Sequence, residues 1–319
     1  MPLQYDPDFH QGIAPLRAAA AANGKPDMSD PLLIRKALDP GMALCFAALP
    51  EVPGVGHEVH QITSDGQSIP VHRFWKLDVE KPTPAVVHAH GGGMVFGNVT
   101  MFVKSLSHLV KETGVQIFSV EYRLAPEHPY PIPFEDSYAS LTWLYEHAAK
   151  FSIDPSRIGV FGESAGANLA ASMALMARDR GLSPPVAKQL LVYPMLDDRD
   201  TRPFSALKDV EMWSPEANIT CWSAYLGADF GTDRVSQYAA PARAASVEGL
   251  PATYIEIGNL DIYRDTTLQY ASRIAAADIE LEFHMYEGLP HCFDVFVPFC
   301  APTQKAVSNR IQALAAMWH

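Results

Sequence analysis

The sequence predicts an α/β fold in which helices flank both faces of a mostly parallel central sheet. From about residue 85 onward, short runs rich in β-branched residues alternate with helical patterns, which is typical of a parallel sheet with covered faces. The chain has 319 residues, of which 48% are hydrophobic and 19% are charged. This length suffices for one large core with an added lid, and the composition is that of a globular protein rather than a disordered one.

Six apolar runs are the expected strands of the core. They are 85–90, 115–122, 157–162, 187–194, 252–258 and 279–287. Four further segments have apolar residues at helical spacing or many strong helix formers. They are 134–150, 165–180, 264–278 and 302–318. Upstream, 57–64 and 68–75 alternate apolar and polar residues around Asp65-Gly66, which predicts an antiparallel hairpin at the sheet edge.

Two regions do not follow this alternation. Residues 1–54 have helical character with proline-rich breaks, and residues 198–232 form a long insertion between strands. Long insertions in compact domains are usually lids or binding loops. We therefore expect these two regions to form the two parts of one helical cap, over a core made of residues 55–197 and 233–319.

The formal charge of −12 argues against nucleic acid and anionic membranes as partners, because both attract clusters of Lys and Arg that this chain lacks. The first residues include early acids and no cationic segment before a long apolar run, so no signal peptide is predicted. No apolar stretch approaches the roughly 18 to 20 residues that cross a bilayer. We expect a cytoplasmic protein without a membrane span, and the sequence does not decide whether it forms a homo-oligomer.

The four cysteines indicate neither a zinc site nor a disulfide framework. Cys45, Cys221, Cys292 and Cys300 lack C-x-x-C spacing, so buried free thiols are expected. Only Cys292 stands out, because it follows His291. We expect no metal and no organic cofactor.

The stretch 159-GVFGESAGANLA-170 places Ser164 where a predicted strand gives way to a predicted helix. Gly162 and Gly166 leave room for the very sharp turn that this junction needs. The turn would expose the serine at the carboxyl end of the strand, and the helix N-terminus would direct N–H groups toward it. The short G-x-S-x-G pattern also arises by chance, so a nucleophilic role for Ser164 depends on partners elsewhere in the chain.

A second motif, 88-HAHGGGMVFGN-98, follows the first core strand. Three consecutive glycines expose backbone N–H groups that bulkier residues would shield. The N–H groups of Gly92 and Gly93, with that of Ala165, are candidates for an oxyanion hole. A lone glycine triplet is also common in flexible loops, but a serine turn downstream favours the first interpretation.

A serine hydroxyl needs a base, and the base needs a carboxylate to orient it. In the chain order Ser, Asp, His of this architecture, the base follows the last strand. There, 287-EGLPHCFDVF-296 contains His291, and the loop after the preceding strand, 257-IGNLDIYRD-265, contains Asp261.

Other acids compete with Asp261 for the orienting role. Asp265 falls about one turn into the next predicted helix, where the helix dipole explains an acidic residue. Asp197 and Asp198 follow another strand, where capping or solvation of the loop explains them better. Among the twelve histidines, His284 falls inside the last predicted strand and most others precede the serine turn.

These motifs together resemble the hormone-sensitive-lipase family of α/β-hydrolase carboxylesterases. The matching motifs are H-G-G-G at 90–93, Y-R-L-A-P-E at 122–127, G-E-S-A-G at 162–166 and the loops around Asp261 and His291. The resemblance covers most of the chain, including a two-part cap. It differs at the acid loop, where the family commonly has proline after the Asp, and at Glu163, where Asp is commoner.

The resemblance implies an α/β-hydrolase fold with a helical cap and a small-molecule ester substrate, with short and medium acyl chains favoured over long triglycerides. Ser164 would be the nucleophile, Asp261 the orienting acid and His291 the general base. The oxyanion hole would comprise the N–H groups of Gly92, Gly93 and Ala165. Because His291 must be neutral to accept a proton, activity is expected to fall below about pH 6.5.

Apolar side chains of the insertion suggest an acyl pocket. The candidates are Phe204, Met212, Trp213 and Trp222. Ordinary packing is the alternative explanation for such residues.

Three other functions compete with an esterase. An amidase, lactonase or carbamate hydrolase would use the same triad, whereas a ligand-binding protein on a hydrolase scaffold would have lost the base, which His291 argues against. A dinucleotide-binding enzyme is disfavoured, because no G-x-G-x-x-G follows the first core strand and residues 91–93 precede no obvious helix with an acidic partner.

Overall fold

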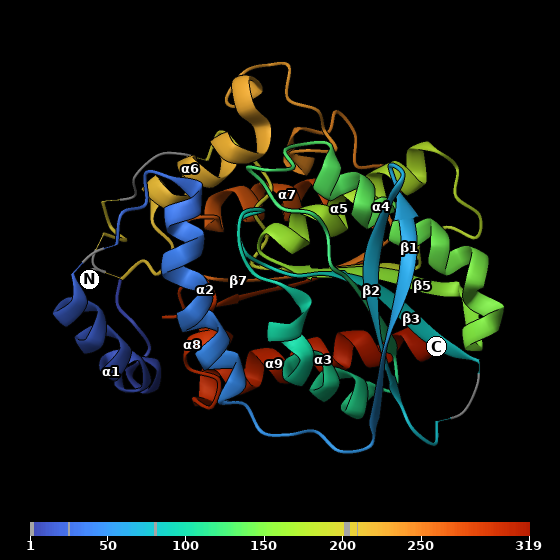
Figure 1. Cartoon of the computed structure of the whole chain (residues 1–319), viewed down its shortest axis with the longest axis horizontal. Coiled ribbons are helices and arrows are strands. Elements are labelled where there is room, and N and C mark those ends of the chain that lie inside the picture. The colour runs from blue at the N-terminus through green and yellow to red at the C-terminus, as the bar shows by residue number, and fades with distance from the viewer. Residues whose placement is uncertain (1–2, 25, 80–81, 201–204, 209) are drawn as a thin grey trace.

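One sheet of eight strands runs through the centre of the described part of the protein (Figure 1). The structure, a computed structural model, describes residues 3–24, 26–79, 82–200, 205–208 and 210–319. The strand order is β1-β2-β4-β3-β5-β6-β7-β8. The strands are β1 (Val55–Ser64), β2 (Gln67–Lys76), β3 (Thr83–Ala89), β4 (Gln116–Val120), β5 (Ile153–Glu163), β6 (Lys188–Val192), β7 (Ala252–Gly258) and β8 (Leu281–Tyr286).

The strand pairing confirms the predicted fold class. Strands β3 to β8 pair in parallel, while β2 pairs antiparallel with both β1 and β4. The β1–β2 hairpin lies at the sheet edge, as the alternating pattern predicts. Every residue of β3 and β4 is buried, since helices cover both faces of the parallel part of the sheet.

The helices lie on both faces of the sheet, with α3 and α9 on one face and α4, α5 and α7 on the other (Figure 1). The α-helices are α1 (Pro7–Asn23), α2 (Pro31–Ala47), α3 (Val99–Thr113), α4 (Ile132–His147), α5 (Ala165–Asp179), α6 (Pro215–Leu226), α7 (Arg264–Ala276), α8 (Phe293–Phe296) and α9 (Ala301–Ala315). Four short 3-10 helices are η1 (Ala148–Phe151), η2 (Gly227–Asp229), η3 (Pro241–Arg243) and η4 (Ala316–Trp318).

Helix α3 follows the glycine loop, where no helix was evident from the sequence. Its N-cap is Asn98, whose side chain accepts a hydrogen bond from the N–H of Met101, and it ends at Gly114 in the left-handed conformation. Its apolar face, which includes Phe102 and Leu106, is buried. This face packs beside α9 and positions α3 next to the glycine loop.

Helices α1, α2 and α6 lie near the end of the sheet where the parallel strands finish (Figure 1). A hydrogen bond of 2.7 Å from the Thr220 hydroxyl of α6 to the Met28 carbonyl links the mid-chain insertion to the segment before α2. The two regions predicted to form one cap are therefore in contact. The division of the chain into cap and core remains a prediction.

The segment before α1 crosses the loop that follows β8. The N–H of Asp6 donates to the Gly288 carbonyl at 3.0 Å. Gly288 has φ +72°, and a Cβ there would lie 2.2 Å from the Asp6 nitrogen, so only glycine allows this close approach. Asp6 also caps α1 through its carboxylate.

None of the helices in the described residues is long and apolar enough to cross a membrane.

Candidate active site

Ser164 occupies a strained turn between β5 and α5. Its φ of +55° and ψ of −118° lie outside the regions that non-glycine residues favour, and such strain often marks functional sites. A Cβ on Gly162 would lie 2.2 Å from the Gly166 carbonyl oxygen, and one on Gly166 would lie 1.9 Å from that of Ala89. Both glycines are therefore required for α5 to start directly after the serine and pack against β3.

Three predicted side chains from loops far apart in sequence meet beside this turn. The distance from Ser164 Oγ to His291 Nε2 is 2.8 Å, and that from His291 Nδ1 to Asp261 Oδ2 is 2.6 Å. All three residues are buried. The neutral His291 tautomer that donates Nδ1–H to Asp261 leaves Nε2 free to accept the serine proton.

The acidic loop holds Asp261 in place through its own backbone. The second carboxylate oxygen, Oδ1, accepts a hydrogen bond of 2.9 Å from the N–H of Tyr263. Each oxygen of Asp261 thus has one partner, and the oxygen that faces His291 is fixed.

Two opposing effects set the pKa of His291. Burial lowers the pKa of the imidazole, but the negative charge and hydrogen bond of Asp261 act in the other direction and hold it above the ordinary value of 6.5. The charge of Asp261 therefore makes His291 a stronger base than a free imidazole.

Three backbone N–H groups in the segments next to the serine have no hydrogen-bond partner among the described residues. They belong to Gly92, Gly93 and Ala165. Gly92 and Gly93 line a small cavity of about 40 Å³ together with Ser164 and His291, and Ala165 is the first residue of α5. Gly92 has φ +135°, and a Cβ there would lie 1.9 Å from the Phe96 carbonyl oxygen. The tight loop therefore needs glycine at this position, and it leaves donors free for a developing negative charge.

Helix α2 fixes the glycine loop from outside. Arg35 Nε donates to the Val95 carbonyl at 2.6 Å, and its Nη2 donates to the Ala125 carbonyl at 2.8 Å. The Asp39 carboxylate accepts a bond of 2.9 Å from the N–H of Gly97. The guanidinium also pairs with Glu127 at 2.7 Å. The conformation of the loop thus depends on contacts from the N-terminal region.

We expect Arg35→Met to lower kcat/KM about ten- to a hundredfold, because small displacements of oxyanion donors cost rates of this size. The measurement is steady-state hydrolysis of p-nitrophenyl acetate. The matched control is Glu127→Gln, which removes the exposed ion pair and keeps the contacts of Arg35 with the two carbonyls. Equal losses of kcat/KM in both variants would show that the effect comes from the ion pair with Glu127 and not from the contacts of Arg35 with the glycine loop.

Aromatic rings surround the imidazole of His291. Tyr193 and Tyr263 contact it edge-on, with ring centroids 4.9 and 5.2 Å away, and Trp213 lies at 6.4 Å. The Tyr263 hydroxyl accepts a bond of 2.9 Å from Trp213 Nε1 and donates one of 2.7 Å to Asn218 Oδ1. Tyr263 therefore joins the loop of Asp261 to the mid-chain insertion.

We expect Tyr263→Phe to lower the free energy of unfolding by about 1–3 kcal/mol, because it leaves the buried polar groups of Trp213 and Asn218 without their partner. The backbone N–H of residue 263 still holds Asp261. The variant should therefore be less stable, while its kcat stays close to that of the wild type. Urea unfolding and steady-state kinetics measure the two effects. Tyr238→Phe, which removes a hydroxyl at the surface, should cost less, and an equal cost would contradict this account.

The competing acids and His284 lie away from the triad. Asp265 pairs with Arg264, and Asp197 pairs with Arg199. Asp198 accepts hydrogen bonds from Arg243 Nη2 and the N–H of Gly231, both at 2.8 Å. His284 contacts Glu282 within the edge strand. These side chains have structural partners of their own.

The predicted pocket residues have different surroundings. Trp213 lines the cavity beside Ser164, and Met212 lies next to it along an outer cavity bordered by α1 and α2. Trp222 is fully buried and packs against Tyr225 in the core. Phe204 lies outside the described residues. Burial against the core, rather than contact with a ligand, accounts for Trp222.

Several residues around the serine were not predicted. Met42, Phe96, Phe102, Tyr193 and Val295 line the cavity together with Ser164 and His291. Asn98 as the N-cap and Gly114 as the C-cap of α3 could have predicted the helix that carries Phe102. The others come from loops, from α2 and from the short helix α8, where no periodic pattern marks the side that faces the site.

No group of three or more His, Cys, Asp or Glu side chains among the described residues has the arrangement of a metal site. All four cysteines are free thiols, and Cys221 is the most deeply buried of them.

Comparison with known proteins identifies the family. A family model described as alpha/beta hydrolase fold matches residues 86–295. The chain is 34% identical over 272 residues to carboxylesterase NlhH of Mycobacterium tuberculosis, covering 84% of this chain and 85% of that protein. It is 32% identical over 237 residues to esterase LipI of the same organism, covering 74% and 73%.

Solved structures give the same result. A bacterial heroin esterase is similar, with a TM-score of 0.89 and 32% identity over 99% of this chain and 98% of that one. A hyperthermophilic esterase from the archaeon Pyrobaculum calidifontis has a TM-score of 0.85 and 30% identity over 99% of both chains. The chain therefore belongs to the hormone-sensitive-lipase-like carboxylic ester hydrolases of the α/β-hydrolase superfamily.

Proposed function

We propose that the protein is a serine carboxylesterase that hydrolyses short- and medium-chain acyl esters through an acyl-enzyme. The observation that carries the proposal is the continuous contact from Ser164 Oγ through His291 to Asp261, beside three backbone N–H groups without partners among the described residues. This arrangement supplies a nucleophile, its base and the stabilisation of an oxyanion.

In the first half-reaction, Ser164 Oγ forms a bond to the ester carbonyl carbon while its proton passes to His291 Nε2. The carbonyl oxygen becomes negative and accepts hydrogen bonds from Gly92, Gly93 and Ala165. The carbon–oxygen bond to the alcohol then breaks, and the alcohol leaves with the proton from His291.

In the second half-reaction, water takes the place of the alcohol. His291 removes a proton from the water as its oxygen attacks the acyl carbon, and the same N–H groups hold the new oxyanion. The bond to Ser164 breaks, the serine recovers its proton, and the carboxylic acid leaves.

Labelling with a fluorophosphonate tests the nucleophile, and mass spectrometry of the adduct maps it. The expected result is one phosphonyl group on the peptide that contains Ser164. An adduct on a different residue, or no adduct on a folded protein that hydrolyses esters, would refute the assignment.

A series of p-nitrophenyl esters from acetate to palmitate tests the acyl preference. We expect the highest kcat/KM between acetate and octanoate, because the cavities beside Ser164 are small. Faster turnover of a long-chain ester than of butyrate would contradict this preference. A matched pair of ester and anilide with the same acyl group separates an esterase from an amidase.

A further inference from the structure

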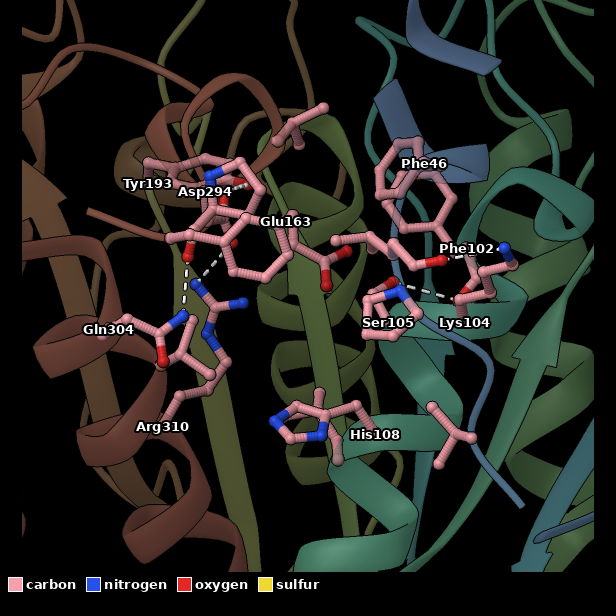
Figure 2. Close-up of a pocket in the computed structure, with 18 residues that line it drawn as sticks. Phe46, Phe102, Lys104, Ser105, His108, Glu163, Tyr193, Asp294, Gln304 and Arg310 are labelled. Atoms are coloured by element: carbon pink, nitrogen blue, oxygen red, sulfur yellow. Dashed lines mark hydrogen bonds and ion pairs between the residues drawn. The ribbon is translucent and has the colours of Figure 1, made fainter. Parts of the chain in front are cut away.

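A second cavity of about 220 Å³ lies next to the small cavity that Ser164 lines (Figure 2). It lies between the end of α2, helix α3 and helices α8 and α9, and we call it the side cavity. It shares four lining residues with the small cavity at the triad: Phe102, Glu163, Tyr193 and Val295. The two cavities are therefore adjacent, with these four side chains at their common boundary. The volume of the side cavity exceeds the roughly 150 Å³ of an apolar protein cavity that holds benzene.

Most of the wall of the side cavity is apolar. The apolar lining residues are Phe46, Leu49, Pro50, Val52, Phe102, Leu109, Val295, Pro298, Phe299 and Val307. Such a wall favours hydrocarbon, because apolar surface gains free energy when it leaves water.

Both cations on the wall already have acidic partners. Arg310 binds the carboxylates of Glu256 and Asp294. Lys104 donates to the carbonyls of Ala47 and Leu49, each at 2.8 Å, and it pairs with Glu51 at 2.9 Å. Neither side chain is therefore a free positive charge that would attract an anionic substrate.

Glu163 places a carboxylate on this wall, which also includes the polar side chains of Ser105, His108, Asp294 and Gln304. Its Oε2 contacts His88 Nε2 at 2.8 Å, and the other His88 nitrogen contacts the Ser119 hydroxyl at 2.8 Å. Its Oε1 has no hydrogen-bond partner among the described residues, and Figure 2 shows the carboxylate pointing into the cavity between Phe102 and Arg310. A buried contact thus fixes one oxygen, and the other faces the side cavity as an acceptor.

We propose that the side cavity binds an apolar arm of the ester that carries a hydrogen-bond donor, an ammonium or a hydroxyl group, and that Glu163 Oε1 accepts from this donor. The inference rests on the proposed esterase function and adds a substrate class to it. An arm that ends in a carboxylate is disfavoured, because it would place a second negative charge beside Glu163 in a cavity of low polarity.

Matched substrates test the proposal. One series consists of p-nitrophenyl esters of hexanoic, 6-hydroxyhexanoic, 6-(dimethylamino)hexanoic and adipic acids, the last as its half ester. A second series carries the same end groups on the alcohol arm of acetate esters. The two series show which arm enters the cavity, and p-nitrophenyl acetate reports the reaction without an arm.

For the wild type, we expect kcat/KM in one series to be about ten- to a hundredfold higher for the ammonium arm than for the carboxylate arm, the range that one hydrogen bond to a charged group supplies. Glu163→Gln should remove most of this ratio, while the hydroxyl arm keeps its advantage because the amide oxygen still accepts. The control is Glu112→Gln on α3, which removes the same charge at an exposed position and should leave the ratio unchanged.

A second variant keeps the proposal testable if Glu163→Gln does not fold. Ser105 lies on α3 and lines the side cavity, so Ser105→Trp should fill it. We expect this variant to lower the ratio of kcat/KM for the six-carbon arms to that for acetate at least tenfold.

The proposal is wrong if wild-type protein hydrolyses p-nitrophenyl acetate but shows no ammonium preference in either series. It is also wrong if Glu112→Gln changes the ratio as much as Glu163→Gln, or if Ser105→Trp leaves the six-carbon arms unaffected. If folded wild-type protein does not hydrolyse p-nitrophenyl acetate, the proposed esterase function is refuted, and this inference is refuted with it.

Discussion

Ser164→Ala is expected to lower kcat/KM for p-nitrophenyl acetate about a millionfold, the size of effect that follows loss of a triad serine. The reason is that, among the described residues, Ser164 Oγ is the hydroxyl that contacts His291 Nε2, at 2.8 Å. The backbone N–H groups remain in place, so a small residual rate above that of water is expected. Steady-state assays with long reaction times measure the residual rate of the variant.

The control for this variant is Ser156→Ala, which removes an exposed hydroxyl that bonds to Asp154 at the surface. Both variants should keep the unfolding temperature within a few degrees of the wild type, and only Ser164→Ala should abolish fluorophosphonate labelling. Activity of Ser164→Ala above one per cent of the wild type, after contamination is excluded by re-purification, would remove Ser164 from the mechanism.

Asp261→Asn is expected to lower kcat/KM about ten-thousandfold at neutral pH. An amide at this position no longer accepts Nδ1–H with a full negative charge, and its NH₂ group favours the tautomer in which Nε2 is protonated. The imidazole then cannot accept the serine proton. The measurement is kcat/KM across the pH range from 5 to 10.

The direction of the pH dependence follows from the pKa of His291. The base works only when neutral, and Asp261 holds its pKa above 6.5, so the wild-type rate should fall on acidification with a midpoint above that pH. In Asp261→Asn, burial acts without the opposing charge and lowers the pKa, so the midpoint should move to lower pH. Asp265→Asn removes a partly exposed carboxylate four residues later and should leave the midpoint in place. An unmoved midpoint in Asp261→Asn would rule out this role of the carboxylate.

Much of the fold and the positions of the triad residues could be predicted from the sequence, because both depend on short-range rules. Parallel strands read as continuous apolar runs, and loops at their carboxyl ends meet at one edge of the sheet. Ser164 directly follows such a strand pattern, and Asp261 and His291 lie in the loops after the last two patterns, so chain order sufficed to select them. Gly162 and Gly166 are required by backbone collisions that a local pattern can already reveal.

The surroundings of the triad were less predictable, because they depend on contacts between distant segments. Trp222 and Trp213 lie nine residues apart in one insertion, yet one is core and the other lines the cavity. Packing against the sheet decides which of the two tryptophans is buried in the core, and the sequence of the insertion does not show this packing. Glu163 directly precedes Ser164, but its orientation into the side cavity depends on His88, which comes from β3.

The hydrogen bond from the Asp6 N–H to the Gly288 carbonyl affects how the protein can be engineered. The segment before α1 lies against Gly288, three residues before His291, so a shortened version reduced to the sheet and its flanking helices would leave this loop uncovered. Bulky fusions are better attached at the other terminus, where His319 follows a helical turn on the side of the molecule opposite α1 (Figure 1).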